Sequence, residues 1–372
     1  MRRSALLTAS AFIGLASIVA AGATASASAR TTTAPKVVGA SSFTLNLLGA
    51  PIIVGVTTDP AGNLVDATLN TGTGLTPTAV MPNKVRFENT TLGTSVTVKA
   101  NHGGQSVTAR AAKLADVAGP GGWSGDVFGN GATTTVKFDI GMLADGVSPD
   151  ILHVTAAPCG APVVPAPVAP AAPVAAMTCV VGPTTYGDDE DDNEGTEASA
   201  SVKFSLLGQT RTLRIRVGTH TEDGVTSAAV RISLSKIKGG MTVVVGTAQT
   251  WTGTLCDGTT VASFGYLVDA TTNAVSITTA PTPAAEVKNN ENGVEVRFAN
   301  GPRVRIGVKH DDGGAAVPSL TVKFKCEAGI PTIGGLPADP TIVNQGGHGD
   351  QGGHGGGDGG NNNGGGDNKG ND

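Results

Sequence analysis

The chain has 372 residues, a formal net charge of −5 at pH 7, and only 3% aromatic and 15% charged residues. So small a net charge does not indicate a class of binding partner. The chain is longer than one small hydrophobic core requires, so a division into domains is expected. Frequent glycine and β-branched residues exclude a predominantly helical fold, because they disfavour helices and suit strands joined by turns.

The N-terminus has the three parts of a secretory signal peptide. Met1–Arg3 is positively charged, Ala5–Ala21 is apolar, and Ala27–Ala29 fits the small-x-small cleavage pattern. We predict a signal peptide at 1–29, with Arg30 as the first mature residue. An uncleaved membrane anchor is the less favoured alternative, because the apolar run is short and rich in alanine. No transmembrane segment is expected after cleavage, so the protein is predicted to be secreted and extracellular, or held at the cell surface by non-covalent contacts.

The first β-domain is placed at 30–159. Short runs of alternating apolar and polar residues are separated by turn sequences, which is typical of a sandwich, Ig-like or barrel-like. A helical turn is expected only at Ala111–Ala118. Trp123 is interpreted as a core or sheet-edge anchor, as is Trp251 later in the chain. The expected strands are Phe43–Leu48, Ile52–Thr58, Leu64–Leu69, Lys84–Asn89, Ser95–Ala100, Ser106–Ala112, Thr133–Ile140 and Ile151–Ala156.

Residues 160–178 form a Pro/Ala-rich linker. Prolines cannot donate to a sheet ladder and hold the chain extended, so this segment is predicted to be a semi-rigid spacer between two domains. The four cysteines of an exported chain point to disulfides, and four cysteines allow three pairings. We favour one bond between the ends of the spacer and one within the second domain, namely Cys159–Cys179 and Cys256–Cys326.

The second β-domain is placed at 179–330. It opens with an acidic loop at 188–197, for which three roles are expected as alternatives: calcium binding, docking on its own domain, and docking on a neighbouring molecule. The expected strands are Ser201–Leu207, Thr212–Thr219, Thr226–Leu234, Met241–Val245, Thr250–Leu255, Val261–Val268, Ala274–Thr279, Val294–Ala299, Arg303–Lys309 and Leu320–Cys326.

The C-terminal segment 331–372 is rich in Gly, Asn and Asp and has no apolar pattern after Pro337. Such a composition buries too little apolar surface to offset chain entropy, so a disordered tail is predicted. His348 and His354 occur in repeated Gly-Gly-His triplets, which make a weak metal site without further ligands. We therefore predict no metal and no cofactor.

One hairpin-like pattern appears twice, at Val85–Gly104 and at Val296–Gly314. In each copy apolar residues alternate with charged ones before and after a turn, which predicts two strands with one face in the core. Other echoes between the halves have different offsets, so the pattern favours two similar β-domains without showing a simple duplication.

Catalytic motifs are missing from the sequence. The segment Gly122–Asp126 resembles a nucleophile elbow but lacks its spacing, and no phosphate loop or metalloprotease helix is present. We predict a non-enzymatic protein. The alternative is a secreted hydrolase whose site is assembled from loops. A cluster of exposed Ser, His and Asp would favour that alternative, whereas a continuous Arg/Lys face would favour binding.

The strongest functional candidate is a set of basic residues in the second domain. Between residues 179 and 328, 14 Lys and Arg stand against 10 Asp and Glu once the acidic loop is set aside. Basic residues that alternate with apolar ones must share the outward face of a strand. The first hairpin carries Lys84, Arg86 and Lys99 beside Glu88, and the second is the more basic copy. The candidate binding residues are Arg214, Arg216, Arg297, Arg303, Arg305 and Lys309.

These observations predict a structural, adhesive or binding protein of the bacterial cell surface or extracellular matrix. The expected partner is an anionic surface polymer, which a basic sheet face attracts in a salt-dependent way. Self-association through the acidic loop is a second expectation, and nucleic acid is a less favoured ligand. The simpler interpretation of the arginines is that they solvate the sheet and protect it from edge pairing.

Overall fold

The computed structural model describes residues 39–70, 74–159, 177–188, 196–222, 225–291, 293–310 and 316–334. The predicted signal peptide, nearly all of the linker and acidic loop, and the tail beyond residue 334 lie outside this part of the chain. The described residues are mostly strand, with a 3-10 turn at Leu114–Asp116 inside the expected helical turn. The predicted all-β fold is therefore confirmed.

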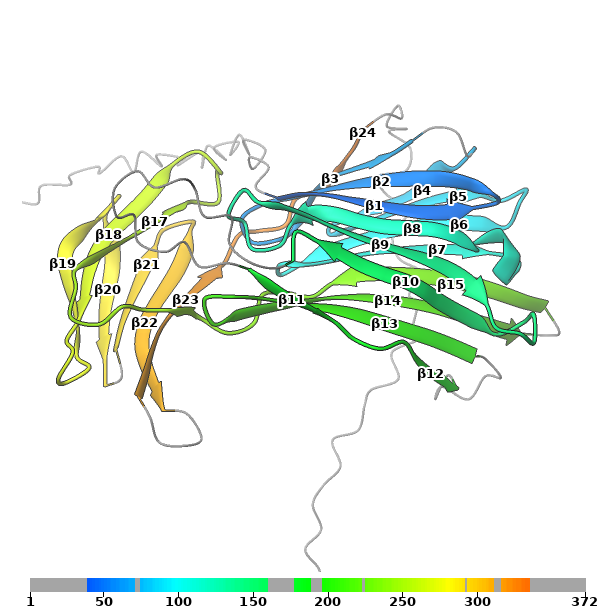
Figure 1. Cartoon of the computed structure of the whole chain (residues 1–372). Helices are drawn as coiled ribbons and strands as arrows, with labels where there is room; N and C mark the ends of the chain where they lie inside the picture. The colour runs from blue at the N-terminus through cyan, green and yellow to red at the C-terminus, as the bar shows by residue number, and fades with distance from the viewer. Residues whose placement is uncertain are drawn as a thin grey trace, which may run out of the picture. The chain divides into compact units, whose positions relative to one another are not determined.

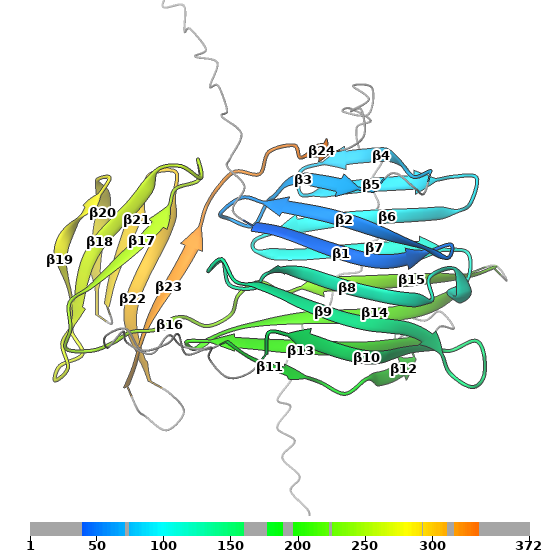
Figure 2. The same cartoon turned by 45° about the horizontal axis from the view of Figure 1, so that its top comes forward.

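Two large sheets form the first sandwich (Figures 1 and 2). Sheet A has the strand order β10-β9-β8-β1-β2-β3-β24, and all neighbours are antiparallel except β3 and β24. Its strands are β1 (Gly39–Leu47), β2 (Ala50–Thr58), β3 (Leu64–Leu69), β8 (Gly119–Asp126), β9 (Thr133–Met142), β10 (Pro149–Ala157) and β24 (Thr332–Gly334).

Sheet B lies against sheet A and has the order β11-β13-β14-β15-β7-β6-β5-β4, with β12 also paired to β13. Its strands are β4 (Thr76–Met81), β5 (Lys84–Asn89), β6 (Thr94–Asn101), β7 (Gly104–Ala111), β11 (Thr178–Val181), β12 (Thr185–Asp188), β13 (Thr196–Leu206), β14 (Gln209–Glu222) and β15 (Val225–Leu234).

A second, smaller sandwich follows in the chain. Sheet C has the order β16-β23-β22-β21-β20, and sheet D has the order β17-β18-β19. The strands are β16 (Met241–Thr242), β17 (Gln249–Thr254), β18 (Val261–Val268), β19 (Val275–Thr282), β20 (Ala285–Asn290), β21 (Gly293–Phe298), β22 (Pro302–His310) and β23 (Ala316–Phe324). Both copies of the hairpin pattern form the expected strand pairs, β5–β6 and β21–β22.

Each sandwich has its own hydrophobic core, built by alternation along the strands. In the first core the indole of Trp123 packs against the ring of Phe204 from the opposite sheet, with ring centroids 6.3 Å apart. In the second core Trp251 stacks on Phe298 with a centroid distance of 5.7 Å. Both tryptophans are buried, as expected for core anchors.

The cores divide the chain differently from the predicted domain boundary at 160–178. The first core contains residues on both sides of that segment, up to Leu234, and the second begins at Val243. The cause is the pairing of β7 with β15, in which Val107 lies opposite Ile232. Strands from before and after the linker therefore share one sheet.

Both predicted disulfides are confirmed. Cys159 follows β10 at the edge of sheet A, and Cys179 lies on β11 at the edge of sheet B. Their Cα atoms are 5.4 Å apart. This bond joins the residues at the two ends of the linker, and both of these ends belong to the first sandwich. Cys256 and Cys326 join the turn after β17 in sheet D to the chain just after β23 in sheet C.

A buried arginine at the start of β14 ties the first sandwich together. Arg211 Nε donates to the Ser235 carbonyl and Nη1 to the Val127 carbonyl, both at 2.7 Å, and Nη2 donates to the Gly103 carbonyl. Burial lowers the pKa of Arg211 to about 10, so the group stays charged at neutral pH. Three separate turns are thus held by one guanidinium.

Candidate functional site

The predicted binding residues are divided between two sheets. Arg214 and Arg216 lie on β14 of sheet B, whereas Arg297 lies on β21 and Arg303 and Arg305 lie on β22 of sheet C. The backbone of the sixth residue, Lys309, belongs to β22, and its side chain lies outside the described part of the structure. The six residues therefore do not form one continuous sheet face.

Sheet B brings Arg214 and Arg216 together with basic residues that the sequence analysis did not select as a site. Inward residues such as Val98, Val107 and Ile215 are fully buried, so the residues between them face outward. The outward basic residues of sheet B, which we call the basic face, are Lys84, Arg86, Lys99, Arg110, Lys203, Arg214, Arg216 and Arg231. All of them are exposed except Lys84, which is half-buried.

Strand register places several of these cations directly opposite one another. Arg216 is paired with Arg231 across β14 and β15, and Lys84 is paired with Lys99 across β5 and β6. The pKa of Lys99 is lowered by partial burial and by the positive charges of Lys84, Arg231 and Arg110. The cations therefore act as one field of positive charge that spans several strands.

Few carboxylates compensate this field. Arg86 pairs with Glu88, and Arg216 Nε lies 3.5 Å from Glu197 Oε1. Within the described part of the chain, no carboxylate lies within salt-bridge distance of the other six cations. Eight cations and two glutamates leave an excess of six positive charges on this face.

Between the cations the face carries small hydroxyl side chains. Arg216 and Arg231 lie in one row with Thr108 and Ser199, and Arg214 lies in the next row with Ser201 and Ser233. No aromatic residue occupies an outward position on β5, β6, β7, β13, β14 or β15 where side chains are described. The surface is therefore basic and rich in hydrogen-bond donors.

The outer face of sheet C is more strongly compensated. Arg297 bonds to Glu295, and Arg303 Nε lies 3.5 Å from the same carboxylate. Glu286 forms ion pairs with two cations: its Oε1 lies 3.1 Å from Lys288 Nζ, and its Oε2 lies 3.8 Å from Arg297 Nη1. The hydrogen bond from Arg297 and the nearby arginines lower the pKa of Glu295. Three of the cations on this face therefore have acidic partners.

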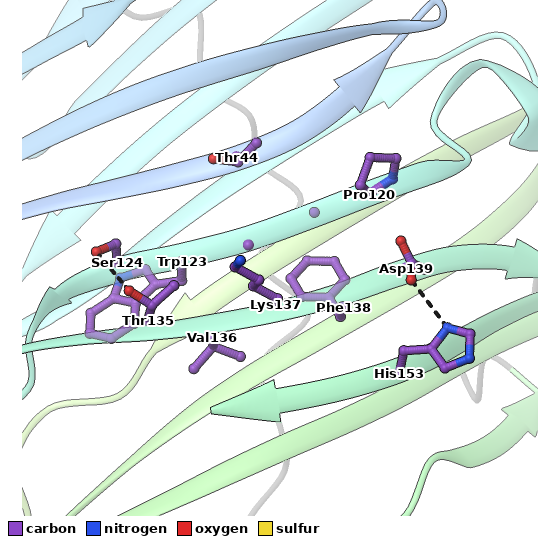
Figure 3. A pocket seen from close by; sticks show the side chains of 12 residues that line it. Thr44, Pro120, Trp123, Ser124, Thr135, Val136, Lys137, Phe138, Asp139 and His153 are labelled. Atoms are coloured by element: carbon purple, nitrogen blue, oxygen red, sulfur yellow. Dashed lines mark hydrogen bonds and ion pairs between the residues drawn. The ribbon is translucent and has the colours of Figure 1, made fainter. Parts of the chain in front are cut away.

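Sheet A has a hollow of about 370 Å³ on its outer face (Figure 3). Gly122 of β8 lies at its floor, and Lys137 of β9 and Thr44 of β1 lie directly across from it on the two neighbouring strands. At one end Ser124 Oγ and Thr135 Oγ1 lie 3.4 Å apart, and at the other His153 Nδ1 lies 3.1 Å from Asp139 Oδ2.

The serine and the histidine of this hollow do not form a catalytic relay. Ser124 is opposite Thr135, whereas His153 contacts Asp139, four residues further along β9. Four residues of extended strand span about 13 Å. Figure 3 shows the side chain of Lys137 between the two hydrogen-bonded pairs. The arrangement suits ligand contacts rather than proton transfer from Ser124 to His153.

Sequence reasoning did not assign Lys99, Arg110 and Arg231 to a site because their strands are far apart in the chain. Each one alternates with apolar residues, as in Val230-Arg231-Ile232, and this signal gives its outward direction. What it does not give is the neighbouring strand. The pairing of β7 with β15 places Arg231 near residues of the first hairpin.

The fold and the basic face define an all-β protein of two sandwiches with a cationic sheet face on the first. No family model, curated protein or solved structure matches the chain. Among the described residues there is no helix long and apolar enough to cross a membrane, and no group of three or more His, Cys, Asp or Glu arranged for a metal ion. The two disulfides are compatible with an extracellular location.

Proposed function

We propose that this protein is exported and binds an anionic polymer of the cell surface or extracellular matrix through the basic face of sheet B. The observation that carries the proposal is the excess of six positive charges on one exposed sheet face. A signal-peptide sequence and two disulfides support the location outside the cell.

The dimensions of the face favour a polymer over a small ligand. The cations run from Lys84 on β5 to Lys203 on β13, which are five strand spacings apart. At about 4.8 Å for each spacing, this distance is about 24 Å. A chain of regularly spaced anionic groups meets several cations at once and releases bound counterions from each contact.

The side chains of the face favour a polymer without bases. Proteins that bind single-stranded nucleic acid combine basic grooves with aromatic rings on which bases stack. The outward positions around Arg214 and Arg231 carry serine and threonine instead. Guanidinium and hydroxyl donors suit carboxylate, sulfate or phosphate oxygens, so the recognised feature is the repeating anionic group.

The binding test compares variants of the full-length chain on immobilised polygalacturonate and polyphosphate over a series of salt concentrations. The triple variant K99Q/R214Q/R231Q removes three cations that have no carboxylate partner among the described residues. We expect at least about a tenfold loss of affinity. The slope of the logarithm of the binding constant against the logarithm of salt concentration should also become shallower by about three, one for each lost contact. The matched control is R303Q/R305Q/K323Q, which removes three exposed cations from sheet C.

Two results would contradict the proposal. One is equal binding by the wild type and the sheet B triple variant on both polymers. The other is an equal loss in the sheet C control, since that would mean that net charge alone decides the affinity. Single-stranded DNA serves as a third ligand, and tighter binding to DNA than to both polymers would replace the proposed ligand class with nucleic acid.

A further inference from the structure

The hollow in sheet A is fixed by the backbone of β8. Gly122 has no side chain, and an ideal Cβ at this position would lie 2.9 Å from the Val136 carbonyl oxygen, which is too close for any other residue. The depression is therefore a permanent feature of the sheet. Its volume of about 370 Å³ lies within the range of small-molecule sites.

Lys137 supplies a single positive charge to the hollow. It is exposed on the outer face of β9, directly opposite Gly122, so its side chain has no neighbour of its own size across the strands. Within the described residues, no carboxylate lies within salt-bridge distance of its ammonium group. A ligand carboxylate above Gly122 would meet this ammonium group without displacing a protein partner.

The rest of the lining offers hydroxyl groups, a carboxylate paired with an imidazole, and an apolar surface. Thr44, Ser124 and Thr135 carry the hydroxyls, and the ring of Pro120 with the bare backbone of Gly122 forms the apolar part. Asp139 and His153 close one end (Figure 3).

The position of His153 depends on an irregular backbone. Its φ is +52°, and the register of β9 and β10 shifts between Leu152 and Thr155. Such bulges turn a side chain away from the regular alternation of a strand. At this bulge the His153 ring lies 3.1 Å from Asp139, beside the hollow.

We propose that this hollow binds an acidic sugar, that is, a ring with several hydroxyl groups and one carboxylate. The carboxylate pairs with Lys137, one C–H face of the ring lies on Pro120 and the glycine backbone, and the ring hydroxyls bond to Thr44, Ser124 and the Asp139 carboxylate. The single cation and the nearby Asp139 disfavour a ligand with two or more negative charges, because the second charge meets like charge.

This site is separate from the basic face, since the two lie on different sheets. The inference therefore does not depend on the proposed polymer binding. Loss of Lys323 from sheet C is the matched control, because it removes one exposed lysine that belongs neither to the hollow nor to the basic face.

The experiment is a calorimetric titration of the full-length protein with D-glucuronate, and with D-glucose as the uncharged match. We expect glucuronate to bind at least about tenfold more tightly than glucose, as one charge-assisted hydrogen bond provides. K137Q is expected to reduce glucuronate affinity at least about tenfold, and K323Q to leave it unchanged. T44V, which removes one hydroxyl acceptor, is expected to weaken binding by a smaller factor.

The proposal is overturned if glucuronate and glucose bind equally, if K137Q binds glucuronate as the wild type does, or if no heat of binding is detected at millimolar ligand. An equal loss in K323Q would also overturn it, because the binding would then reflect net charge. Both substitutions are at exposed positions, so circular dichroism spectra are expected to match those of the wild type.

Discussion

Arg216 and Arg231 lie directly opposite each other on adjacent strands, and both side chains are exposed. Like charges at opposed positions in a sheet are destabilising. In the described part of the chain only Arg216 has a carboxylate nearby, that of Glu197 at 3.5 Å. Two arginines in this relationship do not stabilise the fold, which is consistent with a role in contacting an external anion.

Replacement of one arginine of this pair is expected to stabilise the protein. R231Q removes the repulsion from Arg216 and should raise the free energy of unfolding by about 0.5 kcal/mol in low salt. R231K keeps the charge and should change it much less. Urea unfolding at low salt and in 1 M NaCl measures both effects, and the difference should vanish in high salt. A loss of stability in R231Q would show that the side chain has a structural role.

Arg211 is expected to be among the most sensitive positions of the first sandwich. R211M leaves the carbonyls of Ser235, Val127 and Gly103 without their donor and should lower the free energy of unfolding by about 3 kcal/mol. R211K should recover only part of this loss, because an ammonium group lacks the planar set of donors. R214M on the same strand is the exposed control and should change stability by less than about 0.5 kcal/mol.

Stability of the second sandwich is expected to depend on the charge of Glu295. Its folded pKa is lowered by Arg297 and by the neighbouring arginines, so the unfolded state binds the proton more readily. The stabilisation is therefore present above the usual pKa of a glutamate and is lost as pH falls through the lower folded value. E295Q should melt at a lower temperature than the wild type at pH 7, and the difference should shrink as the pH falls below the usual pKa of a glutamate.

A pH-independent difference between E295Q and the wild type would instead assign the effect to packing. E291Q is a suitable control, because Glu291 is an exposed glutamate just after β20. Its melting temperature is expected to equal that of the wild type across the same pH range.

The two disulfides are expected to differ in their contribution to stability. Cys256 and Cys326 are 70 residues apart. A bond that closes a loop of that length lowers the entropy of the unfolded chain and should raise the free energy of unfolding by about 4 kcal/mol. The bond between Cys159 and Cys179 closes a 20-residue separation and is expected to contribute about 3 kcal/mol. Calorimetry of C256A/C326A and C159A/C179A measures the two losses. A larger loss in C159A/C179A would contradict the loop-length explanation.

Most strands could be predicted from the sequence because alternation of apolar and polar residues is a local signal. The predicted bounds of Lys84–Asn89 and Val261–Val268 coincide with β5 and β18. Strand β8 was missed because five of the seven residues Gly119–Gly125 are Gly or Pro. Its glycines are needed by the core: the ring of Phe138 occupies the space of a side chain at Gly121, and the indole of Trp123 lies 2.9 Å from the Cβ position of Gly125.

By itself the sequence determined the all-β class and the outward direction of the arginines of the basic face, because both follow from local alternation. The positions of the four cysteines along the chain favoured the pairing that forms without requiring it. Only the tertiary structure decided which strands are neighbours. Val107 and Ile232 are opposite each other although 125 residues separate them, and no local pattern encodes that pairing. The basic face depends on it, because its cations come from strands on both sides of the linker.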